Sequence, residues 1–132
     1  MRQMLLVLSA GLSASLMGFL ISSALLKSMG NRALVFYIPA VEELLKTLGA
    51  VIFGAPVVPA HFVFGMVEGL YDLYSSPPDR SFTAFVLSIV SHTLLGTAAW
   101  LVIRVSGSVF AAVLASTVLH SLWNRIMTWY TG

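Results

Sequence analysis

The chain has 132 residues, of which 58% are hydrophobic and 9% are charged, and its formal net charge is +2. So few charged side chains cannot cover a soluble domain, and the scattered basic residues form no patch that would bind nucleic acid. The absence of cysteine excludes disulfides and thiolate chemistry. Length and composition therefore indicate one membrane-embedded domain, residues 1–132.

Five apolar segments predict an all-α polytopic membrane bundle of about five transmembrane helices. They cover about residues 4–26, 33–53, 60–74, 82–103 and 108–130, and short connectors rich in turn-forming residues separate them. The first segment is long for a secretory signal and has no clear cleavage site, so we expect it to be retained. The third is short and contains ionisable side chains, which predicts a short or partly re-entrant helix buried among its neighbours.

The basic residues of the connectors predict the orientation of the bundle. One side carries Arg2 and Arg104, and the side shared with the C-terminus carries four basic residues, Lys27, Arg32, Arg80 and Arg125. Positive charge accumulates on the cytoplasmic side of membrane proteins. We therefore expect the C-terminus in the cytoplasm and the N-terminus outside.

Two adjacent glutamates and a lysine lie inside the second apolar segment. Glu42, Glu43 and Lys46 would each cost about 2.5 to 3.5 kcal/mol near the centre of a bilayer, which marks them as candidates for a functional site. On a helix Lys46 can pair with either glutamate, and the other carboxylate would be free to take up and return a proton as a general base. Alternatively, Pro39 begins a helix and both glutamates occupy its first turn, where the dipole favours anions.

Further polar groups lie in the later segments. Glu68 follows Phe64 by about one helical turn, and its alternative role is an ion pair or hydrogen bond between helices. His92 lies in the middle of its segment and is either a packing residue or part of a site. His120 and Asn124 share a helical face, where both could donate hydrogen bonds to one oxyanion. Their alternative role is hydrogen bonding between helices.

Small and polar residues of the first and third segments complete the pattern. The serines and glycines of residues 9–23 would let another helix approach closely, as would Gly65 and Gly69. His61 and Gly65 share one stripe with Glu68 and Asp72, so a glycine leaves room beside the carboxylate of Glu68. Asp72 lies near the end of its segment, where we expect an interfacial position.

The order of these residues resembles that of the PrsW-like membrane proteases. The likeness covers about residues 39–124 and has four parts: Glu42-Glu43-x-x-Lys46, Phe64-x-x-x-Glu68, an intramembrane His92, and His120-x-x-Trp-Asn124. That family is related to the type II CAAX prenyl endopeptidases and the bacterial CPBP (Abi) proteins. The resemblance implies a glutamate-dependent intramembrane endopeptidase of a prokaryotic plasma membrane, without cofactor. Its substrate would be a membrane-anchored protein or peptide, such as an anti-sigma factor.

The resemblance also implies roles for individual residues. Glu42 would activate water, and Glu43 and Lys46 would set its charge and orientation. Glu68 stands where the prenyl endopeptidases have a histidine, which implies two carboxylates that share a proton and disfavours a prenyl-cysteine substrate. The tetrahedral oxyanion would be held by His120 and Asn124, with His92 as a supporting group and Phe64 beside the site.

Other functions stay open beside the metal-independent endopeptidase that we favour. Zinc held by Glu42, Glu68, His92 and His120 would make the same hydrolysis metal-dependent. A non-catalytic, CPBP-like binding or immunity protein would keep the fold and use its polar centre for recognition. A proton-coupled transporter would use the same groups as a relay, although no internal repeat is evident. Five spans are fewer than these relatives lead us to expect, which implies a minimal core, a homo-oligomer or the loss of helices.

Overall fold

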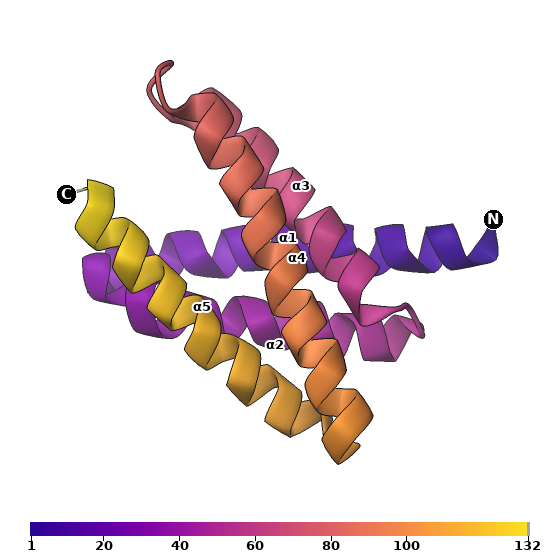
Figure 1. Cartoon of the computed structure of the whole chain (residues 1–132). Helices are drawn as coiled ribbons and strands as arrows, with labels where there is room; N and C mark the ends of the chain where they lie inside the picture. Colours follow the sequence, from indigo (N-terminus) through magenta and orange to yellow (C-terminus); the bar gives the residue numbers. More distant parts are fainter. Residues whose placement is uncertain (132) are drawn as a thin grey trace.

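The computed structural model describes residues 1–131 and consists of five α-helices and one π-helical segment (Figure 1). The elements are α1 (Arg2–Met29), η1 (Ala33–Tyr37), α2 (Ile38–Phe53), α3 (Val57–Ser75), α4 (Ser81–Ser106) and α5 (Val109–Thr131). No strand occurs among the described residues. This confirms the predicted all-α helical bundle.

Three of these helices, α1, α4 and α5, are long and apolar enough to cross a membrane. Many of their large apolar side chains are exposed on the outside of the bundle, among them Leu16, Leu20, Leu94, Leu101 and Leu122. Exposed leucines at this density suit a lipid environment and would be a liability in water. The chain is therefore a membrane protein with transmembrane helices.

The helix α2 lies at the centre of the arrangement and contacts α1, α3 and α5. In Figure 1, α1 and α2 run side by side, and the closely packed pair of α3 and α4 crosses them. The helix α5 packs against both α2 and α4. This central position explains why a helix with two glutamates and a lysine is tolerated, since its neighbours shield the charges from lipid.

The third apolar segment differs from its prediction. The helix α3 is continuous from Val57 to Ser75, has 19 residues and begins three residues before the predicted start; it is not among the helices that are long and apolar enough to cross a membrane. Pro59 lies in its first turn, where a missing N–H leaves no hydrogen bond unmade. A proline that we assigned to the connector is thus part of the helix.

Glycines bring the helices into close contact, as predicted for Gly65 and for the first segment, and Gly96 does the same without having been predicted. A Cβ atom on Gly65 would lie 2.9 Å from Cβ of His92, and one on Gly96 would lie 2.6 Å from Cβ of His61. On α1, a Cβ atom on Gly11 would collide in the same way with a side chain of α3. These glycines therefore let α3 approach α1 and α4 so closely that its histidine and the histidine of α4 reach the centre of the bundle.

Candidate functional site

A π-helical turn precedes the two glutamates of α2. Pro39 is the second residue of α2, but the chain is already helical before it, because the N–H of Ile38 donates to the carbonyl of Ala33, the first residue of η1. Glu42 and Glu43 therefore lie within a continuous helical stretch. The alternative that they occupy a first turn opened by Pro39 is wrong, because a π turn accommodates the proline without ending the helix.

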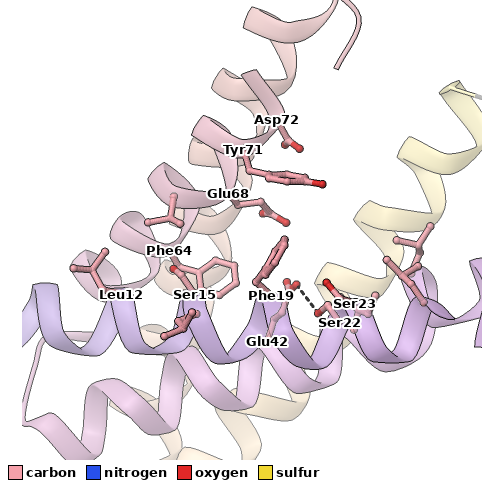
Figure 2. A pocket seen from close by; sticks show the side chains of 15 residues that line it. Leu12, Ser15, Phe19, Ser22, Ser23, Glu42, Phe64, Glu68, Tyr71 and Asp72 are labelled. Carbon is pink, nitrogen blue, oxygen red and sulfur yellow. Dashed lines mark hydrogen bonds between the residues drawn. The ribbon is translucent and has the colours of Figure 1, made fainter. Parts of the chain in front are cut away.

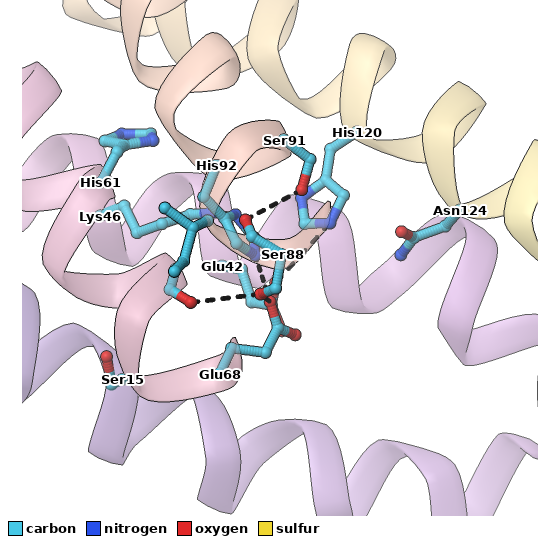
Figure 3. A network of polar contacts seen from close by, with 12 residues as sticks. Ser15, Glu42, Lys46, His61, Glu68, Ser88, Ser91, His92, His120 and Asn124 are labelled. Atoms are coloured by element: carbon cyan, nitrogen blue, oxygen red, sulfur yellow. Dashed lines mark hydrogen bonds and ion pairs between the residues drawn. The ribbon is translucent and has the colours of Figure 1, made fainter. Parts of the chain in front are cut away.

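The same turn leaves one backbone carbonyl without a helical donor. The Leu34 carbonyl would pair with the N–H five residues on, but that residue is Pro39, and the N–H of Ile38 is directed to Ala33. The side chain of Asn124 supplies the missing donor, because its Nδ2 donates to the Leu34 oxygen at 2.9 Å. One of its two amide hydrogens is thus committed to joining α5 to η1, and Figure 3 shows its carboxamide set apart from the histidines.

Lys46 pairs with Glu43, as its spacing allowed. The Lys46 Nζ lies 2.5 Å from Glu43 Oε1, and neither side chain is exposed. The same carboxylate oxygen lies 2.9 Å from Nδ1 of His120. An ionised carboxylate can only accept, so Nδ1 of His120 carries a proton and Nε2 is the acceptor when the ring is neutral. In that state His120 cannot be the oxyanion donor that we predicted.

Lys46 also fixes the orientation of His92. Its Nζ lies 2.9 Å from His92 Nδ1, and an ammonium group can only donate, so Nδ1 accepts and Nε2 carries the proton. That proton is donated to Oε2 of Glu68, which also accepts from the Ser88 hydroxyl at 3.1 Å (Figure 3). Glu68 is therefore held between α3 and α4 by two donors, which is the alternative role that we considered for it.

Phe64 packs against this network and lines the larger cavity. Its ring lies with its centroid 4.5 Å from Lys46 Nζ, and 5.0 Å from the centroid of the His92 ring in an edge arrangement. An aromatic face stabilises an ammonium that has lost its water. Phe64, which we predicted as a supporting residue of the site, thus lies beside the buried Lys46.

Glu42 is the glutamate that lacks a close partner. Its Oε1 accepts a long hydrogen bond of 3.5 Å from Ser22, and its buried Oε2 has no hydrogen-bond partner among the described residues. That Oε2 lies 3.9 Å from Nε2 of His120, the nitrogen that acts as an acceptor. A water about 2.8 Å from each atom would donate one hydrogen to Glu42 and the other to His120.

Two cavities flank the cluster. The larger, of about 490 Å³, lies between α1, α2 and α3, and Figure 2 shows Glu42 and Glu68 turned toward it. The smaller, of about 190 Å³, lies between α3, α4 and α5 and is lined by His92 and His120. Glu68 and Asp72 line both cavities. The site can therefore be approached from two sides.

His61 belongs to the cluster, although the sequence did not identify it as a site residue. It is fully buried, its Nε2 lies 3.1 Å from the Thr47 hydroxyl, and its Nδ1 lies 3.8 Å from Glu43 Oε2. The available signal was its place seven residues before Glu68, on the same face of α3. Thr47, which follows the predicted Lys46 by one residue, carried no signal of its own.

Three of the predicted zinc ligands come together. Glu42, His92 and His120 each offer one ligand atom, and these atoms lie within 4.8 Å of one another. Glu68, the fourth predicted ligand, contacts His92 but is outside this group. A tetrahedral zinc holds its oxygen and nitrogen ligands roughly 3.3 Å apart, so the cluster would have to contract to bind one.

No protein-family model matches the chain, and no curated protein or solved structure is significantly similar to it. The likeness to the PrsW-like proteases therefore consists of the ordered motifs alone.

Proposed function

We propose that the chain is a glutamate-dependent intramembrane endopeptidase whose nucleophile is a water molecule held by Glu42 and His120. The observation that supports this function is the pair of facing acceptors, Glu42 Oε2 and His120 Nε2, which lie 3.9 Å apart, with Glu42 lining the larger cavity and His120 the smaller. Two acceptors engage both hydrogens of one water and leave its lone pairs free for attack. A general base has to be within hydrogen-bond reach of the proton that it removes.

Hydrolysis would proceed with Glu42 as the proton carrier. The water oxygen forms a bond to the peptide carbonyl carbon while one of its protons passes to Glu42, which leaves a tetrahedral oxyanion. The carbon–nitrogen bond then breaks, and the proton on Glu42 passes to the departing amine nitrogen. Protonation of Glu42 in the first step removes the negative charge nearest the oxyanion, which favours this assignment over one in which Glu42 stays ionised.

The neighbouring residues hold this pair in place. Glu43 binds Nδ1 of His120 and so directs Nε2 toward Glu42, and Lys46 balances the charge of Glu43. Asn124 has one amide hydrogen that Leu34 does not use, and it lines the smaller cavity with His120, so it would act as the oxyanion donor for a carbonyl that reaches from the larger cavity toward the smaller one. In this assignment His120 orients the water, and Asn124 keeps the role implied by the resemblance.

The larger cavity is the proposed binding site for the substrate. Apolar side chains, chiefly leucines and aromatic rings, make up most of its lining, and Glu42 of α2 and Glu68 of α3 point toward it (Figure 2). Apolar walls with a few polar groups are typical of a site that binds an apolar ligand and acts on one bond. The substrate class that fits is a membrane-anchored protein or peptide, cut in a prokaryotic plasma membrane.

A zinc-dependent version of the same hydrolysis is the second candidate, supported by the convergence of Glu42, His92 and His120. Against it, both ring nitrogens of His92 are engaged, one with Lys46 and one with Glu68. Zinc at His92 would have to displace one of these partners. We therefore favour the metal-independent reaction.

The test is cleavage of a quenched-fluorescent library of transmembrane peptides by purified protein in liposomes. Glu42→Gln and His120→Ala are each expected to lower kcat by about 10²- to 10⁴-fold, the contribution of a positioned acid or base. Asp79→Asn, on an exposed connector, is the matched control and should leave activity unchanged. Chelator should have no effect, and loss of activity restored by zinc would instead establish the metal site.

Other outcomes would favour the remaining functions. A folded wild-type protein that cleaves no peptide, and a Glu42→Gln variant with the same behaviour, would contradict the endopeptidase and favour a binding or immunity protein. Uptake of a solute into the liposomes that depends on Glu42 and on a proton gradient would identify a transporter.

A further inference from the structure

The two cavities differ in the chemistry of their walls. The larger is lined mainly by apolar side chains of α1 and α3, such as Leu12, Leu16, Phe19 and Val67. The smaller cavity has a far larger polar share in its walls, and seven of its eleven lining residues are polar: Glu68, Asp72, Ser88, Ser91, His92, His120 and Asn124. Polar groups without protein partners cost free energy in a dry site, whereas a polar cavity of this size holds water.

The smaller cavity extends toward one end of the bundle. Its lining residues belong to the second half of α3, the first half of α4 and the second half of α5. Figure 1 shows α4 and α5 diverging from their shared connector toward this end. Residues 76–80 join α3 to α4 there, and the side chains of Asp79 and Arg80 are 74% and 66% exposed. Charged, exposed side chains indicate contact with water at the membrane surface.

We propose that the smaller cavity is a hydrated vestibule that connects the cluster at Glu68, His92 and His120 with water at the end of the bundle formed by residues 76–80. The larger cavity has the more apolar walls and stays dry by comparison. The two cavities meet at Glu68 and Asp72 and otherwise have different walls, so an apolar ligand and water reach the cluster by different routes.

Its role in catalysis rests on the proposed endopeptidase function. Each cleavage consumes one water molecule and releases a carboxylate and an amine, which are poorly solvated by apolar walls. The vestibule would bring in the water and let a polar product leave. Its hydration follows from its lining and position, however, and can be measured without any cleavage.

The chain offers a matched pair of positions for this measurement. It contains no cysteine, so a single introduced thiol reacts without background. Ser91 lines the smaller cavity and Ser15 the larger, and each residue is 8% exposed. Ser116 is 0% exposed and lines neither cavity, which makes it a buried control. Ser75, the last residue of α3, and Ser106, the last residue of α4, are exposed and mark opposite ends of the α3–α4 pair, so labelling of each shows which vesicle face that end occupies.

The experiment is the labelling of single-cysteine variants in sealed vesicles by a quaternary-ammonium methanethiosulfonate, which does not cross lipid. Because apolar surroundings suppress the reactive thiolate, Ser91→Cys should react about tenfold faster than Ser15→Cys. It should react from the vesicle face that labels Ser75→Cys. If Ser91→Cys is unstable, Ala84→Cys and Val67→Cys provide a second pair, one on each cavity.

Three results would contradict the proposed vestibule. Ser91→Cys could react no faster than Ser15→Cys, it could react as slowly as the buried control Ser116→Cys, or it could react from the vesicle face that labels Ser106→Cys. Failure of the endopeptidase function is a separate result, because it appears as absent cleavage and leaves the labelling rates unchanged. A chain that labels as expected and cleaves nothing would keep the hydrated vestibule and lose the hydrolysis.

Discussion

The ion pair between Glu43 and Lys46 is the part of the network whose energetics can be predicted most directly. Both side chains are fully buried, and each has a histidine as a second partner, His120 for Glu43 and His92 for Lys46. Removal of one partner leaves a buried charge without compensation, whereas removal of both charges does not. The informative variants are therefore Lys46→Met, Glu43→Gln and the double substitution.

The magnitudes follow from the contacts that each variant loses. Lys46→Met leaves the carboxylate of Glu43 with His120 as its remaining close donor, and we expect the free energy of unfolding to fall by about 3–5 kcal/mol. In the double variant the glutamine oxygen still accepts from His120, so the main loss is the donor to His92, at about 1–3 kcal/mol. The double variant should therefore be more stable than Lys46→Met by about 2 kcal/mol.

The assay is equilibrium unfolding in mixed micelles, followed by circular dichroism and tryptophan fluorescence. Lys27→Met removes an exposed lysine from the last turn of α1 and is the matched control, with no change expected. A double variant whose loss equals the sum of the two single losses would refute the reasoning, since additivity means that the two side chains do not act as a pair.

Two further variants test the backbone and the packing that position the site. Asn124→Leu should lower the free energy of unfolding by about 1–3 kcal/mol, because the Leu34 carbonyl loses its donor. The loss should be smaller in a Pro39→Ala background, because alanine restores the N–H that the proline lacks. Equal losses in both backgrounds would contradict the link between Pro39 and the hydrogen bond from Asn124 to Leu34. Gly96→Ala should lower the free energy of unfolding by about 1–3 kcal/mol, because its Cβ would lie 2.6 Å from Cβ of His61. The control Gly49→Ala, whose nearest contact is 3.9 Å away, should stabilise α2 slightly. Thermal unfolding in detergent compares the two variants, and similar changes in their melting temperatures would refute the close packing at Gly96.

The sequence predicted the helices well because their signals are local. Apolar length identifies α1, α4 and α5, and the i, i+3 spacing of Glu43 and Lys46 is enough to predict that a pair forms. Spacing could not decide which of the two glutamates takes the lysine, since both lie within reach on one face. That choice depends on His120, which reaches Glu43 from a helix 77 residues away in the chain.

Other features of the site depend on tertiary structure in the same way. The hydrogen bond from Asn124 to Leu34 exists because a π turn frees a carbonyl, and nothing in the local sequence indicates the π turn except a proline that equally suits a helix start. The two cavities depend on the angles at which α3 and α4 cross the other helices. A periodic pattern identifies the face of a helix but not the crossing angle.

The unequal environments of neighbouring glutamates argue for function at Glu42. Glu43 binds Lys46 and a histidine through Oε1, and Glu68 binds a histidine and a serine, so each of these carboxylates has close donors, although Oε2 of Glu43 is also buried without a hydrogen-bond partner. Glu42 differs because neither of its oxygens has a close donor: Oε1 has a long contact to Ser22, and Oε2 is buried without a partner, a defect that costs about 1–3 kcal/mol. A cluster that served stability alone would be improved by glutamine or leucine at this position. Local rules are broken chiefly at functional sites. The water that we propose between Glu42 and His120 would provide the missing hydrogen-bond donor, so the unpaired oxygen is what a water-binding site requires.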